Sequence, residues 1–151
     1  MIDIIALLVS YGLLGLFIVN ILSSSILPIP SEPAIILATA TYGPYITLFV
    51  TLIGAMIGSI TSYIVGYTGL RLLIFRRDKE KEPKSKKWLE KYGLWSLIIV
   101  QWVPFIGDPL MVLMGMIKID FKKFLIFLFI GELIKAVGVI LLGEAVLSFV
   151  V

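Results

Sequence analysis

Two stretches, Pro28-Ile29-Pro30-Ser31-Glu32-Pro33 and Pro104-Phe105-Ile106-Gly107-Asp108-Pro109, decide the fold of this chain. Both follow the pattern Pro-x-x-small-acid-Pro, and both lie within long runs of Leu, Ile, Val and Met. Proline interrupts a helix and frees backbone groups that lipid cannot satisfy, so such backbone persists at membrane depth only inside protein or beside water. A carboxylate at that depth is costly unless it is paired, protonated or hydrated. Interrupted apolar segments at matching places in two halves are typical of a transporter site.

The composition predicts one small membrane domain covering residues 1–151. The chain is 60% hydrophobic with a mean hydropathy of +1.08, far above the values of soluble domains. It contains no cysteine and no histidine, which excludes disulfides, thiolate chemistry, histidine-based acid–base catalysis and ordinary zinc sites. We therefore expect no metal and no cofactor.

The net charge of +3 is concentrated in one loop. Residues 75–91 contain eight basic side chains against four acidic ones. A run this short and interleaved with acids does not favour nucleic-acid binding. Basic loops between apolar segments remain in the cytoplasm, so we predict a multi-pass protein of the cell membrane whose loop 75–91 is cytoplasmic.

The lengths of the apolar arms predict the topology. Gly93–Val103 has eleven residues and as a helix would reach about 16 Å, roughly half of a hydrocarbon core about 30 Å thick. Leu110–Lys118 is equally short, and basic residues flank both arms, which indicates a re-entrant hairpin on the cytoplasmic side. Tyr45–Ile74 then runs inward from outside, so the first hairpin enters from outside. Ile4–Leu27 is long enough to span, which leaves the side of the N-terminus open.

The fold class predicted is therefore an all-α integral membrane protein with an inverted repeat of two re-entrant hairpins, each followed by a long transmembrane helix. The first repeat covers about 4–74 and the second about 92–151. We call the two stretches at residues 28–33 and 104–109 the proline boxes. The halves also match before these boxes, where Tyr11-Gly12-Leu13 corresponds to Tyr92-Gly93-Leu94.

Glu32 and Asp108 are the first candidates for a site. Each could take a proton or contact a polar head group, or it could cap the helix that follows, where free N–H groups favour an acid. A proline after the acid suits the cap. Burial and a nearby cation or helix N-terminus shift a carboxyl pKa in opposite directions, so we predict pH dependence without a midpoint. The hairpin turns are assigned to Pro28, Pro30, Pro33, Pro104, Gly107 and Pro109.

Glu132 and Lys135 lie three residues apart on one face of the last apolar run. They could neutralise each other within the helix bundle, or Lys135 could supply a cation to the proline boxes. Arg71 lies near the cytoplasmic end of its run, where it is expected to snorkel, and it is a weaker candidate for a phosphate contact. Gly54-x-x-x-Gly58 predicts close helix packing.

These motifs resemble the DedA superfamily, also called the SNARE-associated or VTT-domain membrane proteins. The resemblance rests on Leu27-Pro28-Ile29-Pro30-Ser31-Glu32, on the glycine run from Gly54 to Gly69, and on Trp102-x-Pro104-x-x-Gly107-Asp108-Pro109, whose Gly-Asp-Pro form resembles the YqaA-like branch. It implies two opposed re-entrant hairpins and a role in moving lipids between leaflets. Bacterial relatives are linked to undecaprenyl phosphate recycling and maintenance of the proton-motive force, and eukaryotic relatives to phospholipid scrambling.

The chain departs from the family pattern at three positions. Gln101 and Gly107 stand where the family usually has arginines, and Ser59 stands where an acid often follows the glycine pair. Capture of an anionic head group by those arginines is therefore not available to this chain, although Gln101 remains a candidate for the transport path.

The leading functional hypothesis is a lipid flippase or scramblase for a phospholipid or polyprenyl phosphate, with proton coupling left open. The alternative is an ion- or proton-coupled transporter of a small solute, and a non-transporting scaffold is disfavoured because it has no need of buried carboxylates. No nucleophile–base pair or phosphate loop points to an enzyme, and the flanking sequence does not fit an intramembrane aspartyl protease. The expected partners are membrane lipids and protons or another coupling ion, not nucleic acid. A homo-oligomer is compatible with the sequence.

Overall fold

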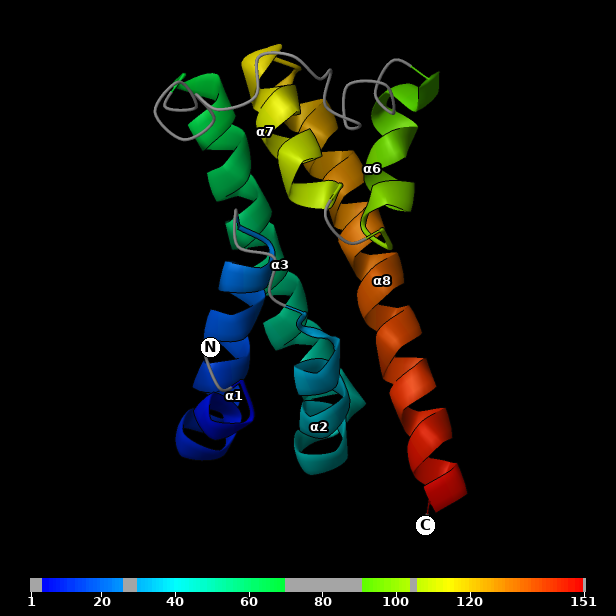
Figure 1. Cartoon of the computed structure of the whole chain (residues 1–151). Coiled ribbons are helices and arrows are strands. Elements are labelled where there is room, and N and C mark those ends of the chain that lie inside the picture. Colours follow the sequence, from blue (N-terminus) through cyan, green and yellow to red (C-terminus); the bar gives the residue numbers. More distant parts are fainter. Residues whose placement is uncertain (1–3, 26–29, 70–90, 104–105, 151) are drawn as a thin grey trace.

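The computed structural model describes residues 4–25, 30–69, 91–103 and 106–150, and all regular structure in these ranges is helical. Six α-helices and one 3₁₀ helix, η1, are seen in this part of the chain (Figure 1): α1 (Ile4–Ser23), α2 (Glu32–Tyr42), α3 (Pro44–Tyr67), η1 (Gly93–Trp95), α6 (Ser96–Val100), α7 (Gly107–Met116) and α8 (Phe121–Val150). The predicted cytoplasmic loop 75–91 lies, except for Lys91, outside the described residues.

Two of the helices, α3 and α8, are long and apolar enough to cross a membrane. Pro44–Tyr67 has 24 residues with a mean hydropathy of 2.0, and Phe121–Phe149 has 29 residues with a mean hydropathy of 2.5. At 1.5 Å per residue both exceed a hydrocarbon core of about 30 Å. These two long apolar helices agree with the prediction from sequence.

The shorter helices gather at opposite ends of the long ones. In Figure 1, α1 and α2 occupy the lower half beside α3, whereas α6 and α7 occupy the upper half beside α8 and α3. The last turn of α1 and the first turn of α2 lie at mid-height, and so do the end of α6 and the start of α7. Each short pair therefore brings the ends next to its proline box into the middle of the molecule.

Gly12 breaks α1, which the view of Ile4–Leu27 as one long arm did not anticipate. Gly12 has φ 56° and ψ −128° inside the helix, a conformation open to glycine because it lacks a Cβ. The segment from Gly12 to Ser23 then reaches only about 18 Å, close to the length of the other arms. Gly93, the position matched to Gly12 in the second half, also has φ 56°.

The first arm of the second half is shorter as a helix than the sequence indicated. Gly93–Val103 forms the 3₁₀ turn η1, the five residues of α6, and turns over residues 101–103. In contrast, α7 starts at Gly107, three residues before the predicted arm.

Glycines set the close contacts of α3. A Cβ on Gly54 would lie 3.0 Å from the Phe17 carbonyl oxygen, and one on Gly58 would lie 2.5 Å from that of Ile21. The Gly54-x-x-x-Gly58 pair thus packs α3 against α1, as predicted. Further along α3, a Cβ on Gly66 would overlap the Val112 carbonyl group, so α7 packs equally closely at the other end.

The turn from α7 to α8 is fixed by side chains that the sequence showed only as a charged patch. Asp120 Oδ1 accepts hydrogen bonds from the backbone N–H groups of Lys122 and Lys123, at 2.9 and 3.3 Å, and so caps α8. The Tyr63 hydroxyl donates to the Ile119 carbonyl oxygen at 2.6 Å. These bonds tie the start of α8 to α3.

Candidate functional site

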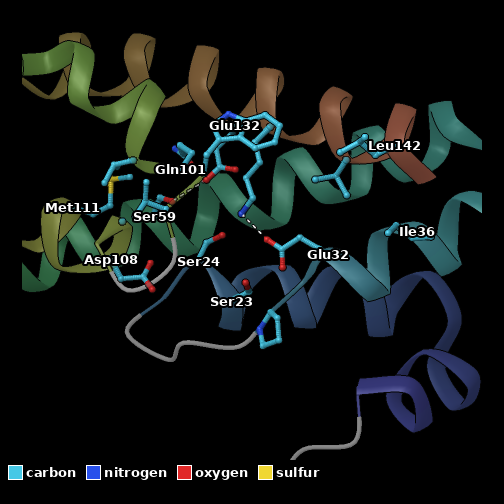
Figure 2. A pocket seen from close by; sticks show the side chains of 17 residues that line it. Ser23, Ser24, Glu32, Ile36, Ser59, Gln101, Asp108, Met111, Glu132 and Leu142 are labelled. Carbon is cyan, nitrogen blue, oxygen red and sulfur yellow. Dashed lines mark hydrogen bonds and ion pairs between the residues drawn. The ribbon is translucent and has the colours of Figure 1, made fainter. Parts of the chain in front are cut away.

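A cavity of about 600 Å³, whose wall is mostly apolar but includes four charged side chains, lies where the two short helix pairs meet α3 and α8. Its walls come from all four of these regions of the fold (Figure 2). The lining residues are Ser23, Ser24, Pro30, Glu32, Ile36, Ser59, Val100, Gln101, Trp102, Val103, Gly107, Asp108, Met111, Glu132, Lys135, Val139 and Leu142.

Three carboxyl groups and one ammonium group reach this cavity from different helices. Glu32 belongs to the first turn of α2, Asp108 to the first turn of α7, and Glu132 and Lys135 to the middle of α8. Figure 2 shows Glu32, Asp108 and Glu132 on separate ribbons around the same space. The geometry thus gathers the charged residues that are scattered through the apolar parts of the sequence.

Lys135 pairs with an acid of the proline box. Its Nζ lies 3.5 Å from Glu32 Oε1, and its side chain is 19% exposed whereas that of Glu32 is 45% exposed. Two roles were considered for Lys135, pairing with Glu132 on its own helix or supplying a cation to the proline boxes. The ion pair in the structure is with Glu32 of the first proline box. Pairing reduces the cost of keeping a charge in an apolar body.

Glu132 is the most buried acid of the cavity, with 4% of its surface exposed. The Ser59 hydroxyl of α3 donates a hydrogen bond to Glu132 Oε1 at 3.4 Å. Gln101 lines the cavity next to α8, where its side chain interacts with the Glu132 carboxyl group, and its buried side-chain nitrogen makes no well-formed hydrogen bond within the described part of the chain.

The acids do not cap their helices through side-chain hydrogen bonds. The N-cap residues are Ser31 for α2 and Ile106 for α7, and neither makes a side-chain capping bond. Glu32 and Asp108 lie one and two positions further on, within the first turn. The capping interpretation is corrected to this extent, although an acid in the first turn still benefits from the helix dipole.

The structure brings most of the predicted site residues together. Glu32, Asp108, Glu132, Lys135 and Gln101 all line the one cavity, together with Pro30 and Gly107 from the proline boxes. Pro33 and Pro109 lie in the first turns of α2 and α7 but not in the cavity wall. Arg71, Pro28 and Pro104 lie outside the described residues.

Sequence reasoning missed the serines and the tryptophan of the cavity wall. Ser59 was noted only as a departure from a family pattern, yet it reaches Glu132. Trp102 packs over Gly138, where a Cβ would lie 2.5 Å from its ring. For Trp102 the signal was Gly138, a small residue on a long helix that marks the place where a neighbour approaches.

The fold and the site define a helical membrane protein with a charged cavity between long apolar helices. Residues 29–145 match the VTT domain, and the chain therefore belongs to the VTT domain family, the DedA superfamily, with similarity to its YqaA-like branch.

Proteins similar to this chain carry names that indicate different activities. The chain is 29% identical over 130 residues to the inner membrane protein YqaA of Escherichia coli, covering 85% of this chain and 88% of that protein. It is 28% identical over 149 residues to undecaprenyl phosphate transporter A of Staphylococcus aureus, covering 89% and 73%. It is 27% identical over 156 residues to an alkaline phosphatase-like protein of Lactococcus lactis, covering 89% and 71%. No solved structure matches the chain significantly.

Proposed function

We propose that this protein transports a lipid between the leaflets of the cell membrane, as a flippase or scramblase. The observation that carries the proposal is the cavity of about 600 Å³, which gathers three acids and a lysine inside an otherwise apolar helical body. Charged groups within a membrane protein mark substrate or ion pathways because their burial is costly without a use. The name of the Staphylococcus aureus relative supports a lipid substrate.

In the proposed mechanism the α1–α2 and α6–α7 pairs enter the membrane from opposite faces and do not cross it. With 11 residues in α2 and 10 in α7, these helices reach about 15–17 Å, or half of the hydrocarbon core. The cavity at their inner ends would take the polar head group. The acyl chains would stay in the bilayer, against exposed apolar side chains such as Phe49, Ile53 and Ile57 of α3.

The charges of the cavity support a zwitterionic head group over a phosphate monoester. Among the described lining residues, Lys135 is the one cation, and it is already paired with Glu32. When they are ionised, Asp108 and Glu132 would repel a doubly charged phosphate and attract an ammonium group. The phosphate of a zwitterionic lipid could then face Lys135 and the N-terminus of α2.

Transport by purified protein in lipid vesicles tests the proposal. We expect fluorescently labelled phosphatidylethanolamine to move between leaflets faster than in empty vesicles, and faster than labelled phosphatidylglycerol. Uptake of small solutes by the same vesicles would instead indicate a solute transporter. Lipid movement equal to that of empty vesicles for every head group, with and without an imposed proton gradient, would contradict lipid transport.

A parallel assay for phosphate release separates transport from the enzymatic activity that the name of the Lactococcus lactis relative suggests. The same vesicles and lipids are used, and inorganic phosphate is measured over the period of the transport assay. We expect no phosphate release above that of vesicles without protein.

A further inference from the structure

The wall of the main cavity changes from charged to apolar along α8. The cavity is lined on this helix by Glu132, Lys135, Val139 and Leu142, whose spacings of three, four and three residues place them on one face. The two charged residues come first, and the two apolar residues follow toward the carboxyl end of the helix. The cavity therefore has a charged part, which suits a head group, and an apolar part, which does not.

The facing wall on α2 changes in the same order. Glu32 and Ile36, one helical turn apart, both line the cavity, and the acid comes first. Helix α2 packs against α8, and both helices run toward the lower end of Figure 1. In Figure 2, Ile36 and Leu142 lie at the opposite side of the view from Asp108. Both walls thus become apolar in the same direction, and we call the part of the cavity lined by Ile36, Val139 and Leu142 the apolar crevice.

Side chains from the two short helix pairs approach α8 on either side of this crevice. Trp102, which follows α6, packs over Gly138, and Ile36 of α2 packs at Gly143, where a Cβ would lie 3.3 Å from Ile36 Cγ1. The two glycines are about 7.5 Å apart along the axis of α8, and Leu142 lies between them in the sequence. The apolar crevice therefore lies at the boundary between the α1–α2 pair and the α6–α7 pair.

The crevice opens to the surface past exposed apolar side chains. Val139 is 6% exposed, whereas Leu142 is 59% exposed and Trp102 is 47% exposed. Lys135 lies at the middle of α8, and Leu142 is about 10 Å further along the helix axis. If α8 crosses the membrane, Leu142 therefore lies within one half of the hydrocarbon core, which is about 15 Å thick. At that depth the opening meets acyl chains and not water.

We propose that the apolar crevice holds the first methylene groups of one acyl chain of the transported lipid, while the head group occupies the charged part of the cavity. The proposal rests on the proposed transport function and adds that the protein recognises the chain as well as the head group. Without the crevice, a head group in the charged part would press its methylene groups against charged side chains and strip them of hydration. The rest of the chain leaves past Leu142 into the hydrocarbon. Because the predicted topology places the α2–α3 corner outside, the crevice opens into the outer half of the membrane.

Photo-cross-linking to the purified full-length protein in detergent tests the proposal. The probe is phosphatidylethanolamine with a diazirine on an acyl carbon close to the glycerol, and mass spectrometry locates the labelled residue. We expect label on Val139, and we expect excess unlabelled phosphatidylethanolamine to remove it. An excess of alkane should not remove it, because an alkane has no head group to hold it in the cavity. Phe49, which is 64% exposed on α3 and does not line the cavity, is the reference for labelling that does not saturate. Absence of label on Val139, or its equal loss with alkane, would overturn the proposal.

Two adjacent leucines of α8 provide a matched pair of variants. Leu142 lines the cavity and Leu141 does not, although they are 59% and 58% exposed. Leu142→Trp crowds the mouth of the crevice, so it should lower both the labelling of Val139 and the rate of lipid movement by about tenfold. Leu141→Trp adds the same bulk outside the cavity and should leave both at the wild-type level. Equal effects of the two substitutions, or wild-type labelling of Val139 in Leu142→Trp, would contradict a chain in the crevice.

The acyl-chain site and the transport function can fail separately, because labelling measures binding and the vesicle assay measures movement. Saturable label on Val139 in a protein that moves no lipid would support the acyl-chain site and contradict the transport function. Lipid movement by the wild-type protein without label on Val139 would support the transport function and contradict the acyl-chain site.

Discussion

Lys135 is the residue on which the charge balance of the cavity depends. It is the cation among the described lining residues, and it faces three carboxyl groups. Its partner in the structure is Glu32, from the other half of the chain, rather than Glu132 one turn away on the same helix. The lysine thus joins the first proline box to α8, and its role extends beyond neutralising its own helix.

Neutralising Lys135 should destabilise the fold, and neutralising both partners should destabilise it less. Lys135→Met leaves Glu32 without its cation in a low-dielectric site, whereas Lys135→Met with Glu32→Gln removes both charges. A double-mutant cycle on thermal unfolding should give a coupling energy of about 0.5–3 kcal/mol. Lys123→Met, at an exposed lysine of the same helix, serves as control. A coupling indistinguishable from zero would mean that the ion pair contributes nothing.

The acids of the two proline boxes should carry the pH response of transport. Glu32→Gln and Asp108→Asn keep the shape of each side chain and most of its hydrogen bonding but remove ionisation. We expect either change to flatten the pH dependence of lipid movement while the protein stays folded. Glu144→Gln, at an exposed acid of α8 outside the cavity, should keep the wild-type profile. Normal transport by both box variants at every pH would show that these acids act only as first-turn charges of their helices.

At the scale of elements, the contact between α3 and α7 depends on two glycines that face each other. A Cβ on Gly66 would overlap the Val112 carbonyl oxygen of α7, and a Cβ on Gly115 would overlap the Tyr63 carbonyl oxygen of α3. Both overlaps involve backbone, which cannot rotate away as a flexible side chain can. The two helices therefore touch through their main chains at this crossing.

Alanine at either glycine should destabilise the fold. Overpacking of this kind costs about 1–3 kcal/mol, and we expect Gly66→Ala and Gly115→Ala to lower the thermal unfolding temperature in detergent. Gly107→Ala is the matched control, because its nearest neighbour is the Val100 carbonyl oxygen at 3.6 Å. Unfolding of Gly66→Ala at the wild-type temperature would mean that the two helices separate without cost.

The sequence predicted the long helices better than the breaks and turns within and between the helices. Hydropathy and length identify α3 and α8, and Gly43-Pro44 marks the corner between α2 and α3, where Gly43 has φ 84°. Hydropathy does not reveal the break at Gly12, because a glycine within an apolar run is equally compatible with a straight helix. In the structure Gly93, its match in the second half, has the same φ of 56°.

The candidate site was predictable in its charges but not in its pairing. An acid or a lysine inside an apolar segment is visible at once in the sequence, since its burial is expensive. The partner of Lys135 was not visible, because Glu32 is brought near by packing across about a hundred residues of chain whereas Glu132 is near along the helix. The role of Ser59 was hidden for the same reason, since its hydroxyl reaches Glu132 from another helix.

At the scale of the whole molecule, the two ends of the structure expose different corners of the chain. The α2–α3 corner lies at the lower end of Figure 1, and the α7–α8 turn lies at the upper end. Tyr42 and Lys118 are exposed at these two corners. If α3 and α8 cross the membrane, the two corners face opposite sides of it, as an inverted repeat requires.

Single cysteines at Tyr42 and Lys118 test this arrangement directly, because the chain has no natural cysteine to give background. We expect a membrane-impermeant thiol reagent to label Tyr42→Cys in intact cells and to label Lys118→Cys only after the membrane is opened. Lys91→Cys, at an exposed residue before η1, should behave as Lys118→Cys does, because both flank the second short helix pair. A permeant reagent should label all three variants and so show that each thiol is accessible. Labelling of Tyr42→Cys and Lys118→Cys from the same side would rule out hairpins from opposite faces. The cavity would then have to be reached by a lipid head group in some other way.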